Sequence, residues 1–359
     1  MNKSRLDRIV EKMKEKGLPQ IIVADEQSFL YLLGVSIMPL ERVCAFLIKD
    51  NGEMHIFANK ILLFKPIDGI ELHVHDDGDP VYAEIASYLT PGIVGFDRLW
   101  AGFHIIGILN ARKDIQPVVA TIVDEVRAVK DAEEIEKLRF AGKLDDEAIN
   151  YGISLLKEGI NEKEFSDKIC DFFVEKGNPR NPWGIQCVSF GATGADPHHL
   201  PDKDVVLKPG DAVIMDIFNE VNGYWCDSTR TVFYKEVSDH HRELYEIVKK
   251  AQQAGVDYAK PGVRMCDIDR AARQVIEDAG YGDKFIYRVG HGAGMTVHEE
   301  PNCQQGNETI AEPGMVFSIE PGIYIEGDIG IRIEDLVVIT EDGCETLTKN
   351  SKELQIVGI

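Results

Sequence analysis

The sequence contains no run that approaches 18 consecutive apolar residues, so it predicts no membrane-spanning helix. Its opening stretch, MNKSRLDRIVEKMKEKGL, is charged throughout and lacks the apolar h-region of a secretory signal. The seven cysteines are odd in number, scattered and without a CxxC pair, which is typical of reduced thiols rather than of a disulfide framework. We therefore expect a cytoplasmic protein that has no membrane partner.

Basic residues are also scarce. The chain has 39 Lys and Arg against 61 Asp and Glu, and its formal net charge is -22. Phosphate surfaces would repel such a chain, which argues against nucleic acid or anionic membranes as partners. With 359 residues, 44% hydrophobic and 28% charged, the composition is that of a globular protein of one large or two ordinary domains.

Residues 1–125 predict an N-terminal α/β domain, because short apolar runs alternate with helical patterns. The opening stretch and the segments near 81–90 and 101–112 are expected to be helices. His73 and His75 share one face of an expected strand, but no third metal ligand lies near them in sequence, so we expect both to be structural. The expected strands are 21–25, 44–50, 54–58, 71–75 and 93–97.

Residues 126–359 are expected to form a second, α+β domain, with VRAVK (126–130) at the boundary. Apolar residues at three- and four-residue spacing predict one long helix over 123–159. The charged run from Lys130 to Lys137 within it is expected to be a solvated helix face. Further helices are expected near 161–176, 239–255 and 264–279, with strands up to 234 and again from 286.

An internal repeat lies in this second domain. PGDAVIMD (209–216) and PGMVFSIE (313–320) each begin with Pro-Gly, continue as a strand and end on a carboxylate seven residues after the proline. A second acidic residue follows each unit, Asp227 after the first and Glu334 after the second. Two similar units that each bring two carboxylates predict a pseudo-symmetric domain with its site on the symmetry axis.

Four acidic residues stand inside predicted apolar strands, and one histidine stands in the small-residue segment VGHGAG. Asp216 interrupts the run VIMDIF, and Asn222-Gly223 predicts a hairpin turn that brings Asp227 roughly opposite it. A buried carboxylate without a partner costs several kcal/mol or gives up its charge. Two facing carboxylates repel unless a cation lies between them. The full set is Asp216, Asp227, His291, Glu320 and Glu334.

Two explanations of these acids are open. Any single one can be a satisfied core group, paired with Arg230 or Arg332. The set as a whole favours two divalent metal ions per chain, because four carboxylates neutralise two such cations and one imidazole adds a nitrogen ligand. An oxygen-rich set with one nitrogen suits Mn²⁺ or Co²⁺ best, and Zn²⁺ or Fe²⁺ after them. Two metals about 4 Å apart bind a water as hydroxide and polarise a carbonyl group.

The order MD…CDSTRT…GHGAGMTVHEEP…GMVFSIEPG…IRIED resembles that of the pita-bread-fold metallopeptidases, which include creatinase relatives, Xaa-Pro dipeptidase (prolidase), aminopeptidase P and methionine aminopeptidase. The resemblance covers residues 126–359, and residues 1–125 are similar to the creatinase-like N-terminal domain of the proline-specific branch. It implies a pita-bread (pseudo-two-fold) catalytic domain and a homodimer. It also implies hydrolysis of the bond between an N-terminal residue and proline by a metal-bridging hydroxide, with short peptides that have proline at the second position as substrates.

The resemblance further implies a role for individual residues. Asp216 would chelate one metal with both oxygens, and Asp227 and Glu334 would bridge the pair. His291 and Glu320 would complete the other metal. The implied catalytic residues are His198 near the leaving group, with His199 as its fallback, His298 at the scissile bond, Glu320 as a proton shuttle, and Arg332 for orientation of the carboxylates or the substrate.

Two departures from the family pattern bear on the substrate. Phe218 stands where many members have glycine, which predicts a narrower pocket. Asn302-Cys303 occupies the place of an arginine with which proline dipeptidases commonly hold the substrate's terminal carboxylate, and no Lys or Arg occurs between His298 and Glu320. A dipeptide's carboxylate would then need Arg332 or the N-terminal domain, which favours an aminopeptidase. A lyase or small-molecule hydrolase that reuses the metal site, and a non-catalytic binding module, are the alternatives.

Overall fold

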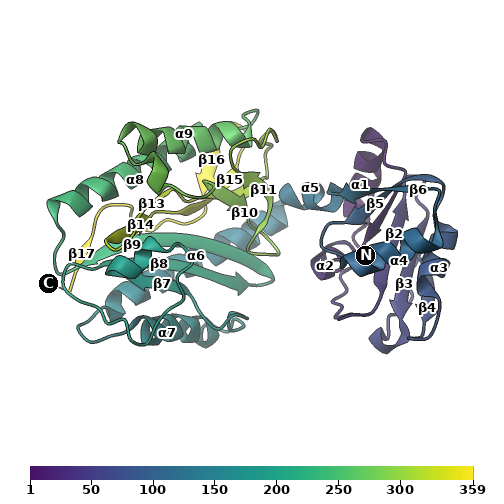
Figure 1. Ribbon diagram of the computed structural model, residues 1–359, viewed down its shortest axis with the longest axis horizontal. Helices are drawn as coiled ribbons and strands as arrows, with labels where there is room; N and C mark the ends of the chain where they lie inside the picture. The colour runs from purple at the N-terminus through teal and green to yellow at the C-terminus, as the bar shows by residue number, and fades with distance from the viewer. Residues whose placement is uncertain (359) are drawn as a thin grey trace. The chain divides into compact units, whose positions relative to one another are not determined.

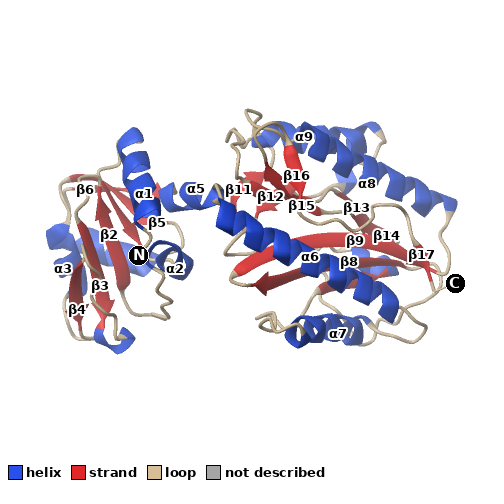
Figure 2. Ribbon diagram, turned by 180° about the vertical axis from the view of Figure 1, so that it is seen from behind, coloured by secondary structure: helices blue, strands red, loops and turns tan. Residues whose placement is uncertain are grey.

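The computed structural model, which describes residues 1–358, divides into two compact units, Met1–Val126 and Arg127–Ile359 (Figure 1). Each unit has its own sheets and its own helices (Figure 2). Among the described residues, no helix has the length and apolar character needed to cross a membrane.

The first unit is built on one six-stranded mixed sheet with strand order β4-β3-β2-β1-β5-β6. The strands β1, β2 and β3 pair antiparallel, whereas β4, β5 and β6 each join a parallel neighbour. The five strands and three helices that the sequence predicts are all present. The elements are α1 (Lys3–Glu15), β1 (Gln20–Val23), α2 (Glu26–Leu33), β2 (Cys44–Lys49), β3 (Met54–Asn59), η1 (Lys60–Leu62), β4 (Glu71–His75), α3 (Val81–Tyr88), β5 (Gly92–Asp97), α4 (Gly102–Ala111) and β6 (Ile115–Ala120).

Two elements of the first unit are not predicted from the sequence. The strand β6 is an edge strand, contains Pro117 and is largely exposed, so its residues show no apolar alternation. The helix α2 has only eight residues, too few for a helical period to stand out. Its ends nevertheless carry local signals, because the Asp25 side chain accepts from the Ser28 backbone N–H and Gly34 closes the helix at φ +70°.

The second unit combines three sheets with helices. A four-stranded sheet has the order β17-β9-β8-β7, a five-stranded sheet has the order β11-β10-β12-β15-β16, and β13 pairs with β14. The helices are α5 (Ile122–Ala128), which spans the unit boundary, α6 (Ala132–Leu155), α7 (Glu162–Glu175), α8 (Asp239–Tyr258) and α9 (Met265–Asp278), with short η2 (Gly191–Ala195) and η3 (Gly282–Lys284). The strands are β7 (Cys187–Phe190), β8 (Ala212–Val221), β9 (Tyr224–Tyr234), β10 (Gly290–Gly292), β11 (Glu299–Cys303), β12 (Val316–Ile319), β13 (Gly322–Ile325), β14 (Ile329–Arg332), β15 (Asp335–Ile339), β16 (Cys344–Thr346) and β17 (Ile356–Val357).

The predicted single helix over 123–159 is wrong in its continuity, because it is interrupted between α5 and α6. Asp131 caps α6 by a reciprocal capping box with Glu134, which starts a new helix at that point. The prediction that the charged run from Lys130 to Lys137 is a solvated helix face is wrong for Lys130. The Lys130 side chain is 1% exposed and lies 2.7 Å from Glu299 Oε1, while Arg127 lies 2.7 Å from Glu299 Oε2. One carboxylate is thus buried between two cations.

The hairpin of β8 and β9 turns at Asn222-Gly223, as predicted, with φ of +54° and +80° at the two positions. In its register Asp227 pairs with Phe218, and Asp216 pairs with Thr229. The two aspartates are therefore diagonal neighbours on one face of the hairpin, a position from which their side chains still reach each other. The prediction that they lie roughly opposite is confirmed with this offset.

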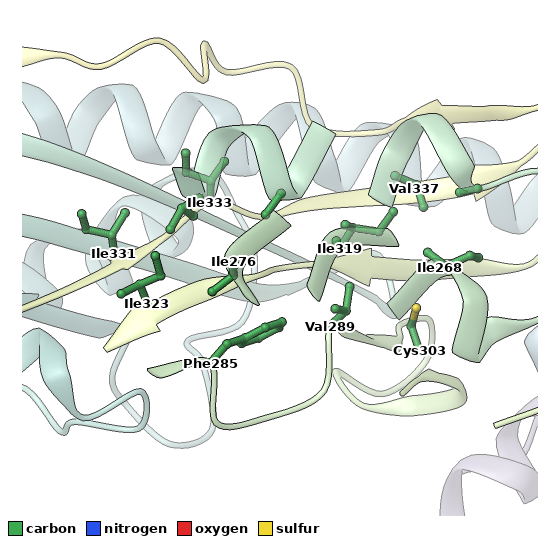
Figure 3. Packing of buried hydrophobic residues seen from close by; sticks show 14 of the residues in the cluster. Ile268, Ile276, Phe285, Val289, Cys303, Ile319, Ile323, Ile331, Ile333 and Val337 are labelled. Carbon is green, nitrogen blue, oxygen red and sulfur yellow. The ribbon is translucent and has the colours of Figure 1, made fainter. Parts of the chain in front are cut away.

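A hydrophobic cluster packs β12 to β15 against α8 and α9 (Figure 3). Ile319 and Ile333 belong to this cluster and are fully buried. Because successive side chains along extended backbone point to opposite sides, burial of these two isoleucines turns the next residues, Glu320 and Glu334, away from the core. Apolar packing thereby aims two of the predicted ligands toward the site.

The buried ion triad gives a test of folding. Replacing Glu299 by Gln leaves the cations of Arg127 and Lys130 buried without a carboxylate, so Glu299→Gln is expected to lower the free energy of unfolding by about 3 kcal/mol. The measurement is urea denaturation followed by tryptophan fluorescence. Glu147→Gln is the matched control, since its 2.8 Å ion pair with Lys176 is exposed and its loss should cost below about 0.5 kcal/mol. Equal effects of the two substitutions would contradict the argument.

Candidate metal centre

Five separate strand segments of the second unit deliver the predicted metal ligands to one place. Asp216 comes from β8, Asp227 from β9 and His291 from β10. Glu320 directly follows β12, and Glu334 lies between β14 and β15. Their potential ligand atoms form overlapping groups, and the atoms within each group lie within 4.8 Å of one another. The groups are Asp216, Asp227 and Glu334; His291, Glu320 and Glu334; and Asp227, His291 and His298.

Close backbone packing explains the glycine before His291. A Cβ atom at Gly290 would lie 1.8 Å from the Ser318 carbonyl oxygen, so only glycine lets β10 approach β12 this closely. The Ser318 hydroxyl then accepts from the His291 backbone N–H at 3.0 Å and donates to Glu320 Oε1 at 3.0 Å. This one serine thus fixes two predicted ligands relative to each other.

In Asp216, Asp227 and Glu334, a protein group from the described part of the chain contacts only one of the two carboxylate oxygens. Arg332 Nη2 lies 2.6 Å from Asp216 Oδ2, and the Thr229 hydroxyl donates to Glu334 Oε2 at 2.7 Å. His291 Nε2 lies 3.6 Å from Asp227 Oδ2. The other oxygen of each of these three carboxylates is buried and has no hydrogen-bond partner among the described residues. Such orphaned oxygens fit direct coordination of a cation.

Burial and mutual repulsion disturb the ionisation of these acids. The pKa of Asp227 is well above its ordinary value because of burial first and then the charges of Glu334, Asp216 and Glu320. Burial and the charges of Glu320 and Asp216 raise the pKa of Glu334 in the same way. Glu320 differs, because its bond to His291 lowers its pKa even though burial alone would raise it. Divalent cations would remove the repulsion, so the donor set fits a metal centre.

Each of the three guanidinium nitrogens of Arg332 forms a hydrogen bond to a residue of the site. Its guanidinium bonds Asp216, donates to the Thr229 hydroxyl at 3.0 Å and donates to the Tyr324 hydroxyl at 2.9 Å. Tyr287 lies next in this network, 2.6 Å from the Tyr324 hydroxyl. Of the two roles that the sequence leaves open for Arg332, this geometry favours orientation of the carboxylates over contact with the substrate.

A pocket of about 940 Å³ opens onto the acidic cluster. Its walls are largely apolar, and Phe218 lies within them against the ring of Trp183, 5.7 Å between centroids. The expectation that Phe218 narrows the pocket agrees with this position. The polar residues of the wall, apart from the cluster and Arg332, include His198, His298, Gln304 and Arg288.

The three histidines of the prediction occupy different surroundings. His198 lines the pocket and is exposed, whereas His199 Nε2 lies 2.7 Å from the buried Glu162 carboxylate and is held as a structural group. The His298 ring lies 4.0 Å from that of His291. His298 keeps an exposed surface, but desolvation by the surrounding pocket, followed by the charge of His291, lowers its pKa to about 4. His298 is therefore a neutral imidazole at neutral pH.

Arg288 is a pocket residue that the sequence search missed. Its side chain is half-buried, donates to Asn302 Oδ1 at 2.5 Å, and forms no ion pair with any described residue. The family pattern predicts the substrate-binding cation after His298, whereas Arg288 precedes His298 by ten residues. The available signal was weak, because a single arginine in YRVG is ordinary in sequence and gains meaning only beside Asn302.

Comparison with known proteins identifies both parts of the chain. Residues 136–341 match the model of metallopeptidase family M24, and residues 5–129 match that of the creatinase/prolidase N-terminal domain. The chain is 41% identical to the Xaa-Pro dipeptidase of Lactobacillus helveticus over 366 residues, which covers 99% of each chain.

Solved structures resemble the whole chain. The dipeptidase PepE from Mycobacterium ulcerans matches with a TM-score of 0.92 and 32% identity, over 99% of this chain and 97% of its own. A prolidase from Thermococcus sibiricus matches with a TM-score of 0.89 and 30% identity, over 99% of both chains. These likenesses confirm the predicted fold class, a creatinase-like N-terminal domain followed by a pita-bread catalytic domain.

The raised pKa of Asp227 predicts an unusual stability effect in metal-free protein. Above about pH 4 the unfolded chain ionises this residue while the folded chain retains the proton, so the unfolded state binds fewer protons and stability falls as the pH rises. Asp227→Asn removes that loss and is expected to stabilise the metal-free protein by about 1–2 kcal/mol at neutral pH. Urea denaturation in excess chelator at pH 4 and pH 7 measures it. A difference that does not grow with pH would contradict the assigned cause.

Proposed function

Because the chain belongs to metallopeptidase family M24, we propose that it is an Xaa-Pro dipeptidase that uses two divalent metal ions per chain. One combination carries this proposal. Three carboxylate oxygens of the pocket have no hydrogen-bond partner among the described residues, and Arg288 in the same pocket forms no ion pair with any of them. The oxygens supply a place for the metals, and the arginine supplies a partner for the carboxyl terminus of a dipeptide. Relatives that bear the name Xaa-Pro dipeptidase support the substrate class.

Five residues would hold the metals in this proposal. Asp216, Asp227 and Glu334 would hold the ions through their carboxylates, each of which has one buried oxygen without a hydrogen-bond partner among the described residues. His291 and Glu320 would complete the second ion. When bound, such a metal pair supplies a hydroxide nucleophile near neutral pH and polarises the scissile carbonyl. The oxygen-rich ligand set with one nitrogen suits Mn²⁺ or Co²⁺.

The chain's own side chains would orient the substrate and move the proton. Neutral His298 would donate to the carbonyl oxygen of the scissile bond, whose developing charge it stabilises. The carboxylate of Glu320 would take the proton of the attacking water and deliver it to the proline nitrogen as the C–N bond breaks. His198 would lie near the leaving proline, and Arg332 would hold Asp216 in place. An Xaa-Pro bond has no N–H, so the enzyme must recognise this bond through its carbonyl and the proline ring rather than through an amide donor.

Substrate length separates a dipeptidase from an aminopeptidase. The sequence favours the aminopeptidase, because it lacks the arginine that commonly follows the HExP motif. The geometry supports the dipeptidase instead, since Arg288 contacts the Asn302 that occupies this place. Arg288 contacts Asn302 through Nη1, and the remaining N–H groups of its guanidinium can donate to a terminal carboxylate. A longer peptide has no carboxylate at that position and would leave Arg288 without its charged partner.

Three further expectations belong to the proposal. A cytoplasmic location accords with seven free cysteines in the structure. A homodimer is implied by the family resemblance alone. No nucleic acid or membrane partner is expected from the net charge of -22.

Activity and metal dependence can be tested together. Chelator-stripped protein is expected to hydrolyse an Xaa-Pro dipeptide only after reloading with Mn²⁺ or Co²⁺, and Asp227→Asn is expected to lower kcat/KM by about a thousandfold or more, equal to about 4 kcal/mol. Release of free proline is the measurement. Absence of hydrolysis despite about two metals bound per chain would reject the peptidase proposal.

The role of Arg288 predicts a selective defect. Arg288→Ala is expected to raise KM for the dipeptide about 10- to 100-fold, because a charge-assisted bond contributes about 1.5–3 kcal/mol, while kcat changes little. The corresponding dipeptide amide, which has no terminal charge, should be cleaved equally by both proteins. Lys284→Ala removes a nearby exposed cation outside the pocket lining and is the matched control. Equal losses on the acid and the amide would exclude carboxylate recognition.

A further inference from the structure

The strands β3 and β4 pair at the edge of the sheet of the first unit (Figure 2), and His55, Glu71 and His73 there form a second cluster of potential metal ligands. The parallel register sets His55 beside Glu71 and Phe57 beside His73. Glu71 and His73 are two residues apart on β4, so both side chains lie on the same face of the strand. The helix α3 contacts this face, since the Tyr88 ring lies 4.6 Å from that of His55 and 4.5 Å from that of His73.

The donor atoms of this group have the spacing of a tetrahedral metal site. His55 Nδ1 lies 3.2 Å from His73 Nε2 and 3.3 Å from Glu71 Oε2, and His73 Nε2 lies 3.8 Å from Glu71 Oε1. Two ligands that bind zinc at about 2.0–2.1 Å with a tetrahedral angle are separated by about 3.4 Å. The two ring nitrogens have this spacing, and each lies near a different oxygen of Glu71, so one atom from each residue can be chosen such that all three lie within 4.8 Å of one another. Coordination would need the exposed Glu71 side chain to turn one oxygen toward both nitrogens.

The outer nitrogens of both rings face carboxylates. His55 Nε2 lies 2.7 Å from Glu53 Oε1, and His73 Nδ1 lies 3.7 Å from Glu84 Oε1. Glu53 is ionised, since hydrogen bonds from Lys49 and then from His55 lower its pKa to about 2. With the protons on these outer nitrogens, both inner nitrogens, which lie 3.2 Å apart, carry lone pairs that can bind a metal ion. Histidines that bind metals are commonly oriented by carboxylates in this way.

The rings are held in this arrangement by packing. The side chains of His55 and His73 are 4% and 9% exposed. His73 stacks on Phe57 with 4.6 Å between centroids and 14° between planes. Glu71 is 61% exposed, which leaves a path from solvent for an ion and for a water ligand. The pair of histidines is thus preorganised, and only the carboxylate has to order.

A direct hydrogen bond between two neutral rings accounts for the surroundings of His55 and His73 less well than a bound cation does. If neutral His73 donates from Nε2 to His55 Nδ1, its own Nδ1 lone pair is turned toward the Glu84 carboxylate, and the two repel. Glu71 then lies beside the rings without a proton to accept from either. A cation bound at the inner nitrogens gives every donor and acceptor of the group an opposite partner.

We propose that His55, Glu71 and His73 bind a transition-metal cation, preferably Zn²⁺, with a water as fourth ligand. Two imidazoles and one carboxylate favour Zn²⁺ over the harder Mg²⁺ and Ca²⁺. The site is separate from the candidate metal centre, whose ligands all belong to the second unit. The expectation that His73 is structural is thereby revised. His75 remains structural, because its ring nitrogens lie 3.2 Å from the Val43 carbonyl oxygen and 3.3 Å from that of Asp76.

Metal counting in the full chain tests the site without reference to activity. Wild type, His73→Gln, Glu71→Gln and His75→Gln are stripped with chelator, dialysed against micromolar free Zn²⁺ and assayed for bound zinc by mass spectrometry. All four proteins have an unchanged candidate metal centre in the second unit, so the metal bound there contributes equally to each and does not affect the differences between them. Wild type and His75→Gln are expected to bind about one more zinc per chain than His73→Gln, and Glu71→Gln is expected to bind that zinc at least tenfold more weakly.

Two controls keep the outcome clear. Far-UV circular dichroism identifies a variant that fails to fold, and Glu71→Gln alters an exposed side chain that folding does not need. Reloading with Co²⁺ gives a second readout, since visible absorption of four-coordinate cobalt from this site should be present in His75→Gln and reduced in His73→Gln. Equal zinc content in wild type, His73→Gln and Glu71→Gln would overturn the proposal, as would an equal loss in His75→Gln.

Discussion

Repulsion among four clustered carboxylates, two buried and two partly buried, is the constraint around which the second unit is organised. Asp216 and Asp227 share one face of a hairpin, and Glu320 and Glu334 are turned toward them by the burial of the isoleucines that precede them. The protein neutralises only part of this charge itself, through Arg332, while Thr229 donates one hydrogen bond to Glu334. Protons relieve the remaining repulsion in the metal-free protein, as the raised pKa of Asp227 indicates, and divalent cations would replace them. A fold that buries these acids is therefore built for metal binding at some expense in stability, which is common at functional sites.

The sequence allowed prediction of those features that have local signals. Asn222-Gly223 specifies its turn through two residues that accept positive φ, and this alone brings Asp227 near Asp216. Acidic residues within apolar strands are visible without knowledge of tertiary structure. The break before α6 also has a local sequence signal, the capping box of Asp131 and Glu134. The apolar period that continues across 123–159 makes this signal easy to overlook.

Features that depend on pairing across the fold could not be predicted. Lys130 lies in a charged segment and resembles a solvated residue until Glu299, far along the chain, is seen to bury beside it. Arg288 acquires significance only from its contact with Asn302. His73 lacked a third ligand in its own segment, because the parallel register of β3 and β4 supplies His55 from another strand. In each case the partner is close in space and carries no short-range sequence pattern.

The buried triad of Arg127, Lys130 and Glu299 also defines what can be removed from the chain. Similarity to the metallopeptidase family begins at residue 136, yet both cations that neutralise Glu299 precede that point. A fragment cut at the family boundary would leave this carboxylate buried and uncompensated, directly beside His298. A fragment that keeps the complete triad must therefore start no later than Arg127, which is the first residue of the second unit.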